Sequence, residues 1–418
     1  MSFSVHGCAA ALFLTCALQA APVVTVPWNG HKGAVSFTFD DGAPTQLTNV
    51  VPSLKKRGIN ATFFVVGNSF GVNLDGWLQA ARAGNEISNH TMTHTNLTTV
   101  DTTVADSEIT GMANTLRKLD TSIQAVTLAY PNCATNDAID RIANREAIIA
   151  RTCGWYTRFA WNSTPSEWAA TTSFIVWDDA TSAEALTEID MAASAGTWMV
   201  TLNHGVGGDW GAVSVPQVDS MFDRALARGL WVATYQDAAA YWRASKTMDT
   251  VQALHSGNGW TLAWTSPHPR MPRQVKLRVK LDTTIFGPSP VVVQGGTPIA
   301  RETDGSWVIY FMKLSLKVAP KGTTGIARTS AGSRIRVQRT PAGLVMQGLR
   351  EGRWQYRLAT PSGRIVQTGI ASSGQEGSVS LSASTRITTL LHLQGPDGEI
   401  VDLAIPAHSE YTSPTPKK

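Results

Sequence analysis

Short apolar runs alternate with stretches of helical periodicity between about residues 34 and 235. This alternation is typical of βα units built around a parallel sheet, and a distorted, closed or nearly closed (β/α) barrel fits it best. One helical stretch, residues 47–57, precedes Gly58, which suits the left-handed conformation that ends many helices. Eight strands are expected, at residues 34–41, 61–67, 86–90, 125–131, 147–154, 173–178, 197–204 and 230–235.

After residue 242 the pattern changes to alternating runs without helical periodicity, such as Gln-Val-Lys-Leu-Arg-Val-Lys-Leu at 274–281. Alternation of this kind predicts half-buried strands, so we expect a β domain at 258–318 and another all-β segment at 330–410. The fold class is therefore α/β, with a barrel at 22–245 followed by one or two small β-sandwiches, two being favoured. Strands of the last segment are expected at 334–339, 354–359, 377–381 and 387–393.

Composition and charge narrow the function classes. A chain of 418 residues with 43% hydrophobic residues can bury the cores of two or three domains. The formal charge of +4, from 35 basic and 31 acidic residues, is too small and too mixed to indicate a polyanion, so nucleic acid is not an expected partner. A count of 14 Trp against 7 Tyr slightly favours a carbohydrate partner, because flat aromatic rings suit the apolar faces of sugars.

The first 21 residues predict export. An apolar core at 8–18 is followed by Gln-Ala-Ala-Pro, which is typical of a signal peptide, although a lipoprotein signal through Cys16 stays open. No later segment has the apolar length that a membrane span requires. We therefore expect a secreted or cell-surface protein without a transmembrane segment.

Two cysteines, Cys133 and Cys153, remain after the expected cleavage. An oxidising compartment would allow a disulfide between them, whereas the alternative is two unpaired buried thiols. Their spacing does not decide between the two, because a disulfide depends on distances that a sequence does not contain.

Two adjacent carboxylates end the first expected strand. The run Val-Ser-Phe-Thr-Phe at 35–39 leads to Asp40, Asp41 and Gly42, where glycine permits a tight turn. Because adjacent side chains of an extended segment point in different directions, one carboxylate can bind a metal while the other stays free as a base. The alternative is an ordinary Asp-Asp-Gly turn satisfied by backbone hydrogen bonds.

Two histidines four positions apart follow the third expected strand. In His90-Thr-Met-Thr-His94, a helical turn would place both imidazoles on one face, where they could bind a single cation. With one aspartate they make a two-His, one-carboxylate set that leaves positions open for water and substrate. Two unrelated surface histidines are the alternative for this pair considered alone.

These motifs occur in a characteristic order. Thr-Phe-Asp-Asp-Gly at 38–42, then His90-Thr-Met-Thr-His94, then Leu-Asn-His at 202–204 resemble the polysaccharide deacetylases of the NodB-homology type, carbohydrate esterase family 4. The resemblance covers roughly residues 30 to 245. It implies hydrolysis of acetyl groups on a polysaccharide or oligosaccharide, with N-acetyl groups of N-acetylglucosamine-type glycans favoured over O-acetyl groups of xylan.

The resemblance also implies residue roles. It makes Asp40 the general base, His204 the general acid, and Asp41, His90 and His94 the ligands of one divalent metal. Zn²⁺ is the expected ion, while Co²⁺, Ni²⁺ or Mn²⁺ would fit the same ligands. The metal would polarise the acetyl carbonyl, Asp40 would take a proton from water, and His204 would protonate the leaving group.

The third family motif departs from the usual pattern. Where the family has Arg, Pro, an aromatic residue and Gly, this chain has Ala129-Tyr-Pro-Asn-Cys133. In the family that arginine holds the base carboxylate, and we hypothesise that Arg151, on the next strand, substitutes for it. By position, the backbone N–H of Asn132 is the expected oxyanion donor, and Tyr130 is expected to line the cleft.

Further site residues are less specific candidates. Because the fourth family motif is not visible, Asp178 or Asp179 could orient His204. Tryptophan side chains could stack on sugar rings, although most tryptophans fill cores. The expected sugar platforms are Trp161, Trp210, Trp168 and Trp177.

Alternatives to a deacetylase stay open. Ala129 motivates a catalytically silent carbohydrate-binding protein that retains the metal site, although Asp40 and His204 beside the metal ligands argue against it. A two-metal phosphohydrolase would need more ligands than this set supplies. The segment from Gly352 onward weakly resembles type IX secretion sorting domains, which would imply contact with secretion machinery; a carbohydrate-binding or spacer module is equally open.

Overall fold

The computed structural model describes residues 21–154, 158–256 and 259–320, together with seven shorter segments near the C-terminus. These segments are 336–340, 343–347, 352–360, 365–373, 378–381, 389–394 and 400–405. The expected signal peptide falls almost entirely in residues 1–20, outside the described part, so export stays a prediction. Within the described part, no helix is long and apolar enough to cross a membrane.

A curled, mainly parallel sheet forms the centre of the N-terminal half. Its strands are β2 (Ala34–Phe39), β3 (Thr62–Val65), β4 (Glu86–Asn89), β5 (Thr127–Ala129), β6 (Ile149–Arg151), β7 (Arg158–Ala160), β8 (Phe174–Ile175), β9 (Thr197–Asn203) and β10 (Trp231–Val232). Neighbours follow the order β6, β5, β4, β3, β2, β9, β7, while β10 pairs with β2 and β8 with β9. Single bridges from Arg151 to Thr171 and from Gly154 to Phe174 connect the β6 edge toward β8, so the sheet is nearly closed.

The expected (β/α) barrel is confirmed. Each of the eight expected strands is present and is shorter than the run that predicted it. Strand β7 was not expected, and it pairs antiparallel with β9 at the sheet edge. Helix α1 (Val51–Arg57) continues a π-helical turn, Gln46–Val50, and ends at Gly58 with φ 65°, which confirms the expected helix and its glycine cap.

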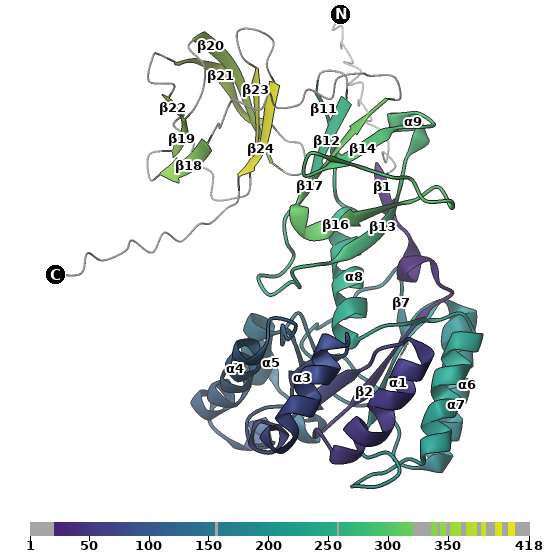
Figure 1. Ribbon diagram of the computed structural model, residues 1–418. Helices are drawn as coiled ribbons and strands as arrows, with labels where there is room; N and C mark the ends of the chain where they lie inside the picture. The colour runs from purple at the N-terminus through teal and green to yellow at the C-terminus, as the bar shows by residue number, and fades with distance from the viewer. Residues whose placement is uncertain are drawn as a thin grey trace, which may run out of the picture.

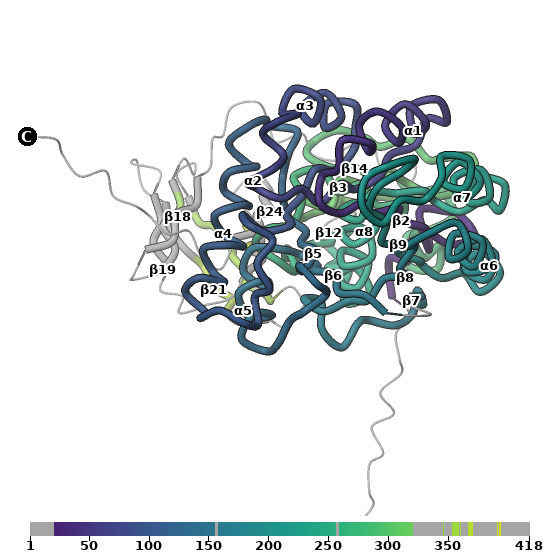
Figure 2. Tube along the Cα trace, turned by 90° about the horizontal axis from the view of Figure 1, so that it is seen from below, coloured from purple at the N-terminus to yellow at the C-terminus, as the bar shows by residue number. Residues whose placement is uncertain are grey.

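Helices surround this sheet. They are α2 (Gly67–Phe70), α3 (Leu74–Arg82), α4 (Thr102–Leu119), α5 (Asp137–Glu146), α6 (Asp179–Ala195), α7 (Val215–Ala227) and α8 (Tyr235–Met248). Figure 2 looks along the barrel and shows α1, α3, α4, α5, α6 and α7 outside the strands. Helix α8 instead lies between the barrel and the β sheets that follow (Figure 1).

Strand β2 shows how the sheet orients its side chains. Phe37 points outward and meets Phe222 of α7 edge-on, with ring centroids 4.8 Å apart. Ser36 accepts a hydrogen bond from Trp198 Nε1 at 3.0 Å within the buried interior. Because side chains alternate along a strand, Asp40 continues the row of Ser36 rather than the row of Phe37.

A β domain follows the barrel, as two sheets. One contains β1 (Val23–Thr25), β13 (Lys276–Leu281) and β16 (Trp307–Tyr310); the other contains β11 (Ala253–Ser256), β12 (Gly259–Ala263), β17 (Ser315–Ala319), β14 (Val291–Gln294) and β15 (Thr297–Ile299). A short helix, α9 (Thr283–Phe286), follows β13. Strand β1 pairs antiparallel with β13, so residues that the sequence pattern grouped with the barrel complete a sheet of the β domain.

The barrel and the β domain share one hydrophobic core. A continuous buried cluster includes Trp198 of β9, Trp242 of α8 and Val279 of β13. Polar contacts also cross the junction, since Arg270 forms an ion pair with Glu146 of α5 at 3.0 Å. The two parts therefore pack as one body rather than as modules joined by a linker.

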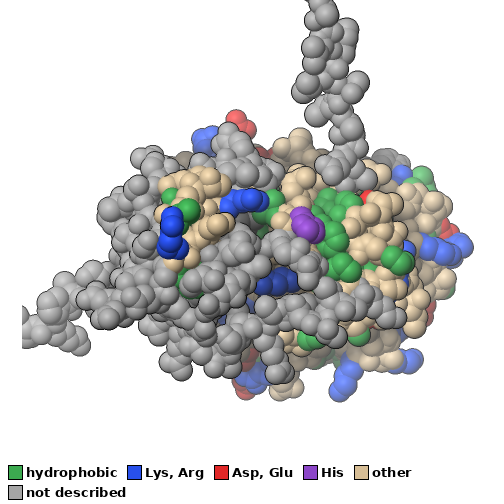
Figure 3. Space-filling view, turned by 90° about the horizontal axis from the view of Figure 1, so that it is seen from above, with side chains coloured by type: hydrophobic (Ala, Val, Ile, Leu, Met, Phe, Trp, Pro, Cys, Tyr) green, Lys and Arg blue, Asp and Glu red, His purple; other side chains and the backbone are tan. Residues whose placement is uncertain are grey.

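The described C-terminal segments form two further antiparallel sheets. One contains β18 (Arg336–Thr340), β19 (Gly343–Gln347) and β22 (Ser378–Leu381); the other contains β20 (Gly352–Ala359), β21 (Ile365–Ser373), β23 (Thr389–Gln394) and β24 (Ile400–Ile405). All-β structure was expected in this region. Seen from the end that carries the β sheets, Lys and Arg side chains are scattered over the described surface (Figure 3).

A buried glutamate lies at the start of β4, at the end of the barrel opposite the carboxyl ends of the strands. Glu86 accepts hydrogen bonds from Thr62 Oγ1 and from the backbone N–H of Gln236, each at 2.8 Å, and from Thr127 Oγ1 at 2.5 Å. Burial raises the pKa of its carboxyl from 4.5 to about 7, because hydrogen bonds from neutral groups do not replace the lost water.

This carboxyl makes the stability of the protein depend on pH. The folded state favours protonated Glu86, so its favourable contribution is complete below pH 4.5 and is lost as the pH rises through about 7. In the wild type, ionisation of Glu86 should lower the free energy of unfolding by up to about 3 kcal/mol as the pH rises. We expect Glu86→Gln to abolish this decrease. Urea unfolding at pH 5 and pH 8 measures it, with exposed Glu184→Gln as the control. Equal pH dependence in wild type and Glu86→Gln would contradict the assignment.

Candidate active site

Four polar residues gather at the carboxyl ends of the barrel strands. Asp40 follows β2, His90 follows β4, Arg151 ends β6 and His204 follows β9. Carboxyl ends of parallel strands lie at the same edge of a barrel, and the side chains meet there. Gln46 joins two of these ends, since its Nε2 donates to Asp40 O at 2.6 Å and to His204 O at 3.1 Å.

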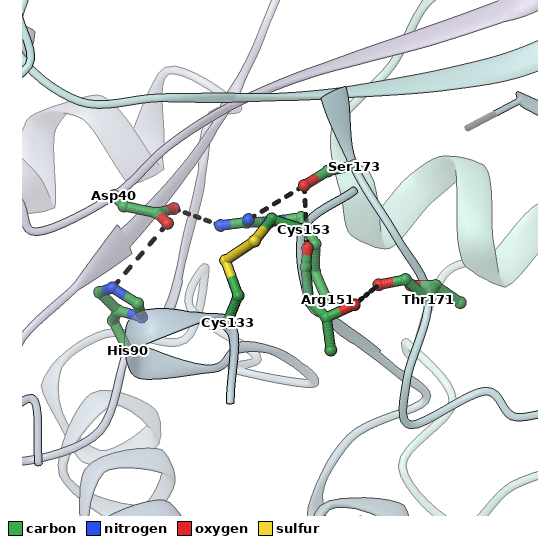
Figure 4. Close-up of a disulfide and its surroundings, with 8 residues drawn as sticks. Asp40, His90, Cys133, Arg151, Cys153, Thr171 and Ser173 are labelled. Carbon is green, nitrogen blue, oxygen red and sulfur yellow. Dashed lines mark hydrogen bonds and ion pairs between the residues drawn. A yellow bond between two sulfur atoms is a disulfide. The ribbon is translucent and has the colours of Figure 1, made fainter. Parts of the chain in front are cut away.

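Asp40 and Asp41 point to different partners. Asp40 is buried, with 3% of its surface exposed, and its Oδ1 accepts a hydrogen bond from Arg151 Nη2. Asp41 has φ 71°, a left-handed conformation that turns its carboxylate toward the two histidines. Its Oδ1 lies 3.4 Å from Nε2 of His90 and 3.4 Å from Nε2 of His94. The other oxygen of Asp40, Oδ2, lies 3.9 Å from Nε2 of His90, so Asp40 contacts Arg151 and one histidine, while Asp41 contacts both histidines (Figure 4).

The segment from His90 to His94 is not a helical turn, so that part of the prediction is wrong. Thr91 and His94 have φ values of 68° and 61°, outside the helical region. Asn89 Oδ1 accepts from the N–H of Thr91 at 2.8 Å, and Thr91 Oγ1 accepts from the N–H of His94 at 3.1 Å. These local hydrogen bonds fold the loop so that the two rings converge, with centroids 4.8 Å apart.

Glu108 of α4 fixes the middle of this loop. Its two carboxylate oxygens accept hydrogen bonds from the N–H and the hydroxyl of Thr93, both at 2.8 Å. Glu108 has 8% of its surface exposed, and Met92 packs against Gly111 one helical turn further along α4. Glu108 was not among the predicted site residues, because nothing in its local sequence pattern indicates contact with a loop 15 residues earlier.

Asp41, His90 and His94 are spaced as ligands of one cation. Their donor atoms all lie within 4.8 Å of one another. Ligands about 2.05 Å from a tetrahedral zinc lie about 3.3 Å apart, close to the two carboxylate–imidazole distances of 3.4 Å. Nδ1 of His90 lies 2.8 Å from Ala129 O, where it donates its proton and leaves Nε2 free as a ligand. The residues present therefore fit a divalent metal.

Electrostatics favour a charged Asp41 beside these histidines. Burial alone would raise the pKa of Asp41, but His90, followed by His204 and His94, holds it below its usual value. Burial likewise opposes protonation of His90, yet Asp40 and Asp41 together raise its pKa. Burial and the neighbouring His90 lower the pKa of His94. The two carboxylates favour a positive charge on the histidines. A bound metal cation would supply that positive charge in place of a proton.

Arg151 lies level with Ala129, the residue at the position where the sequence motif would have an arginine. Strand register pairs Arg151 of β6 directly with Ala129 of β5, so the guanidinium stands one strand away at the same height. It is 1% exposed, donates to Asp40, and donates from Nη1 to Ser173 Oγ at 3.2 Å. Its carbon Cζ lies 5.1 Å from the centre of the Phe64 ring. Figure 4 shows the guanidinium between Asp40 and Ser173.

Cys133 and Cys153 form a disulfide, which decides a question that the sequence left open. Their Cα atoms are 5.4 Å apart, within the usual range for such bridges. The bridge links the turn after β5 to the segment after β6 and lies beside Arg151 (Figure 4). Asn132, the expected oxyanion donor, precedes Cys133 in this turn, and both residues have positive φ, 55° and 57°.

His204 lies between two tryptophans. Trp177 stacks on its ring with centroids 5.0 Å apart, and Trp210 meets it edge-on at 4.6 Å. Nδ1 of His204 is buried and has no hydrogen-bond partner among the described residues. Burial lowers the pKa of His204, against the opposing effect of Asp40 and Asp41. Trp210 and Trp177 remain 64% and 38% exposed, so both offer ring surface to a ligand.

The expectation that Asp178 or Asp179 orients His204 is wrong. Asp178 caps helix α6, where its Oδ1 accepts from the N–H of Thr181 at 2.8 Å. Asp179 accepts from the N–H of Ser214 at 2.8 Å. Both carboxylates are therefore used by backbone N–H groups at helix starts, a role that acidic residues favour.

Two expected substrate contacts are also wrong. Trp161 packs edge-on against Trp28 at 5.0 Å, and Trp28 Nε1 donates to Gly196 O at the start of β9, at the opposite end of the barrel from His204. Tyr130 is 2% exposed, and its hydroxyl donates to Asp140 at 3.0 Å inside a hydrophobic cluster. Both rings pack against other hydrophobic side chains. Trp168 packs in the same way, with its ring centroid 5.1 Å from that of Trp242.

Comparison with known proteins finds similarity in the N-terminal half of the chain. Residues 29–148 match the sequence profile of polysaccharide deacetylases. A peptidoglycan-N-acetylmuramic acid deacetylase of Bacillus subtilis (strain 168) is 33% identical over 90 residues, 21% of this chain and 19% of the relative. A peptidoglycan-N-acetylglucosamine deacetylase of Bacillus cereus is 28% identical over 154 residues, 35% of this chain and 67% of that one. The match thus spans about a fifth of the Bacillus subtilis relative.

Other similar proteins are fungal or of known structure. A chitin deacetylase of Colletotrichum lindemuthianum is 30% identical over 95 residues, which are 22% of this chain and 38% of the relative. A family 4 carbohydrate esterase from Streptomyces lividans, solved with acetate, has a TM-score of 0.36 at 20% identity, covering 48% of this chain and 92% of that chain. A carbohydrate esterase domain of a multidomain xylanase from a Trinervitermes trinervoides hindgut metagenome has a TM-score of 0.36 at 16% identity, covering 49% and 89%.

The ligand spacing predicts that zinc stabilises the folded protein. At a free Zn²⁺ concentration of 100 times Kd, binding adds about 2.7 kcal/mol to the free energy of unfolding, which thermal unfolding detects as a higher Tm. We expect Asp41→Asn and His94→Ala to remove most of this increase. His31→Ala, at an exposed histidine near the other end of the barrel, is the control that keeps it. An undiminished increase in both ligand variants would show that zinc binds elsewhere.

Proposed function

Because the α/β domain belongs to the polysaccharide deacetylase family, we propose that this protein is a metal-dependent hydrolase that removes acetyl groups from a polysaccharide. The observation that carries the proposal is that the carboxyl ends of the strands supply a set of metal ligands and, beside it, a second carboxylate bound by an arginine. Asp41, His90 and His94 converge on one point, while Arg151 binds Oδ1 of the neighbouring Asp40, whose Oδ2 lies 3.9 Å from Nε2 of His90. A metal site alone does not need a second, separately held carboxylate, whereas hydrolysis needs a base.

The chain supplies the groups that acyl transfer requires. A bound divalent metal, with Zn²⁺ proposed from the ligand types, would polarise the acetyl carbonyl and acidify water. Asp40 takes a proton from the attacking water, and Arg151 keeps its carboxylate oriented. The N–H of Asn132 stabilises the oxyanion. His204, buried between Trp177 and Trp210, protonates the leaving amine or alkoxide.

The amide of N-acetylated glycans is the favoured substrate. Relatives named as peptidoglycan and chitin deacetylases support this choice, although the matches are partial. The ring surfaces of Trp210 and Trp177 beside His204 support a sugar at this edge of the site. O-acetyl groups of xylan are the second substrate class, to be separated by the assay below.

We also propose that the protein works outside the cytoplasm, secreted or at the cell surface. The apolar segment at the N-terminus supports export, and the disulfide supports an oxidising compartment. Acetylated glycans of cell walls are found there. The C-terminal sheets are proposed as a sorting or carbohydrate-binding unit.

A silent carbohydrate-binding protein is the competing function, because Ala129 replaces the arginine that holds the base in the family. Arg151 weakens the case for a silent protein. It lies on β6, next to the strand of Ala129, and its guanidinium donates a hydrogen bond to Asp40. The two functions differ in one observable, which is release of acetate.

Acetate release decides between them. We expect the zinc-loaded protein to release acetate from at least one of chitooligosaccharides, peptidoglycan fragments or acetylated xylan. Asp40→Asn should lower turnover by about 10²-fold or more, because the amide cannot accept the proton. Because this change leaves the buried Arg151 without its carboxylate partner, thermal unfolding and zinc stoichiometry of the variant are measured alongside turnover. No release from any glycan by protein carrying one zinc per chain would favour the silent binding protein.

Arg151 gives a second test of the mechanism. Arg151→Ala should reduce kcat by about 10²-fold or more, because Asp40 loses its partner, while zinc affinity stays near that of wild type. Since removal of a buried arginine can also unfold the protein, Arg151→Lys is made in parallel and thermal unfolding is measured for both. Unchanged turnover in a folded Arg151→Ala protein would show that Asp40 needs no arginine.

A further inference from the structure

The disulfide lies where two parts of the proposed catalytic machinery come from different strands. We propose that the Cys133–Cys153 bridge is a positioning device for the active site, which fixes the oxyanion-donating turn relative to Arg151, so that full turnover requires the oxidised protein. The inference rests on the proposed deacetylase function. It goes beyond that function because it makes catalysis depend on a covalent bond outside the set of reacting groups.

The geometry places the bridge between the two parts. Cys133 directly follows Asn132, and Cys153 lies two residues after Arg151. The strands β5 and β6 stay paired up to Ala129 and Arg151, and the N–H of Tyr130 donates to Arg151 O at 3.0 Å. Beyond this point the turn leaves the sheet, and the disulfide crosses to the β6 segment (Figure 4).

The turn itself is held weakly by local bonds. Its hydrogen bonds run within the turn, from Cys133 N to Tyr130 O at 3.1 Å and from Ala134 N to Pro131 O at 3.2 Å. Asn132 is exposed, and two consecutive non-glycine residues with positive φ form a backbone that L-amino acids disfavour. Such a turn needs an external restraint, and the bridge to Cys153 supplies it.

The other end of the bridge is firmly anchored. The N–H of Thr152 donates to Thr171 O at 2.7 Å, and the N–H of Gly154 donates to Ser173 O at 2.9 Å. Ser173 also accepts from Arg151. Cys153 therefore belongs to the same rigid segment that positions the guanidinium against Asp40, and the bridge transfers that rigidity to the turn carrying Asn132.

The two groups that the bridge connects come from different strand ends. Arg151 ends β6 and lies level with Ala129 of β5, while the proposed oxyanion donor, Asn132, follows β5. A covalent link between the two strand ends fixes their separation, which a transition-state contact requires.

The metal ligands do not depend on the bridge. Asn89 and Glu108 hold the His90–His94 loop from β4 and α4. His90 contacts Ala129 O within the paired part of the sheet, before the turn begins. Reduction of the bridge should therefore lower kcat without removing the metal, and this separation makes the proposal testable.

The test compares oxidised, reduced and bridge-free protein. A water-soluble trialkylphosphine reduces the bridge: its phosphorus attacks one sulfur and displaces the other, water hydrolyses the resulting adduct, and two thiols and the phosphine oxide form. A phosphine is chosen because dithiols chelate zinc. We expect kcat to fall at least tenfold, with KM and zinc stoichiometry changed less than twofold, and to recover on reoxidation. Cys133→Ser/Cys153→Ser should match the reduced enzyme and not respond to phosphine.

A second measurement does not need activity. Hydrogen exchange should accelerate at the amides of residues 132–135 on reduction, while the amides of 86–96 stay as protected as before. Unchanged turnover of the reduced enzyme, or unchanged exchange in the turn, would overturn the proposal. If the oxidised protein releases no acetate at all, the proposed function fails, and exchange alone still decides whether the bridge positions the turn.

Discussion

The contact between Asp40 and Arg151 pairs a buried carboxylate with a buried cation at the mouth of the barrel. Both side chains are almost fully buried, where an unpaired charge would be costly. The contact forms only if the end of β6 lies across the barrel mouth from the end of β2. Arg151 reaches Asp40 because the sheet curls until it is nearly closed, which brings the ends of β6 and β2 to opposite sides of the barrel mouth. The remaining chemistry is arranged around it.

The metal ligands are placed by a different means. Left-handed residues at Asp41, Thr91 and His94 aim their side chains inward, and neighbouring polar groups hold each turn. Backbone strain of this kind persists only where the surrounding structure fixes it. The site therefore combines a rigid barrel interior, which holds the base, with strained loops at its rim, which hold the ligands.

The sequence predicted the parts of this arrangement that depend on local pattern. The barrel strands, the glycine cap of α1 and the residues at the strand ends follow from periodicity and motif order. Other features depend on contacts between distant residues. The His90–His94 loop follows hydrogen bonds to Asn89 and Glu108 rather than helical spacing, and Asp178 serves a helix start instead of His204. Trp161 packs against the core beside Trp28, a contact between residues far apart in the sequence that no local pattern indicates.

Strand β1 has a consequence for how this protein can be divided. Its partner, β13, comes more than 250 residues later in the chain. The whole barrel sequence therefore lies between two strands that pair with each other. A fragment ending at residue 245 would keep β1 and lose its partner, and would expose the tryptophan-rich face that α8 shares with the sheets. Exposed strand edges and apolar faces promote aggregation. The smallest piece expected to behave as an independent protein therefore extends from β1 to β17.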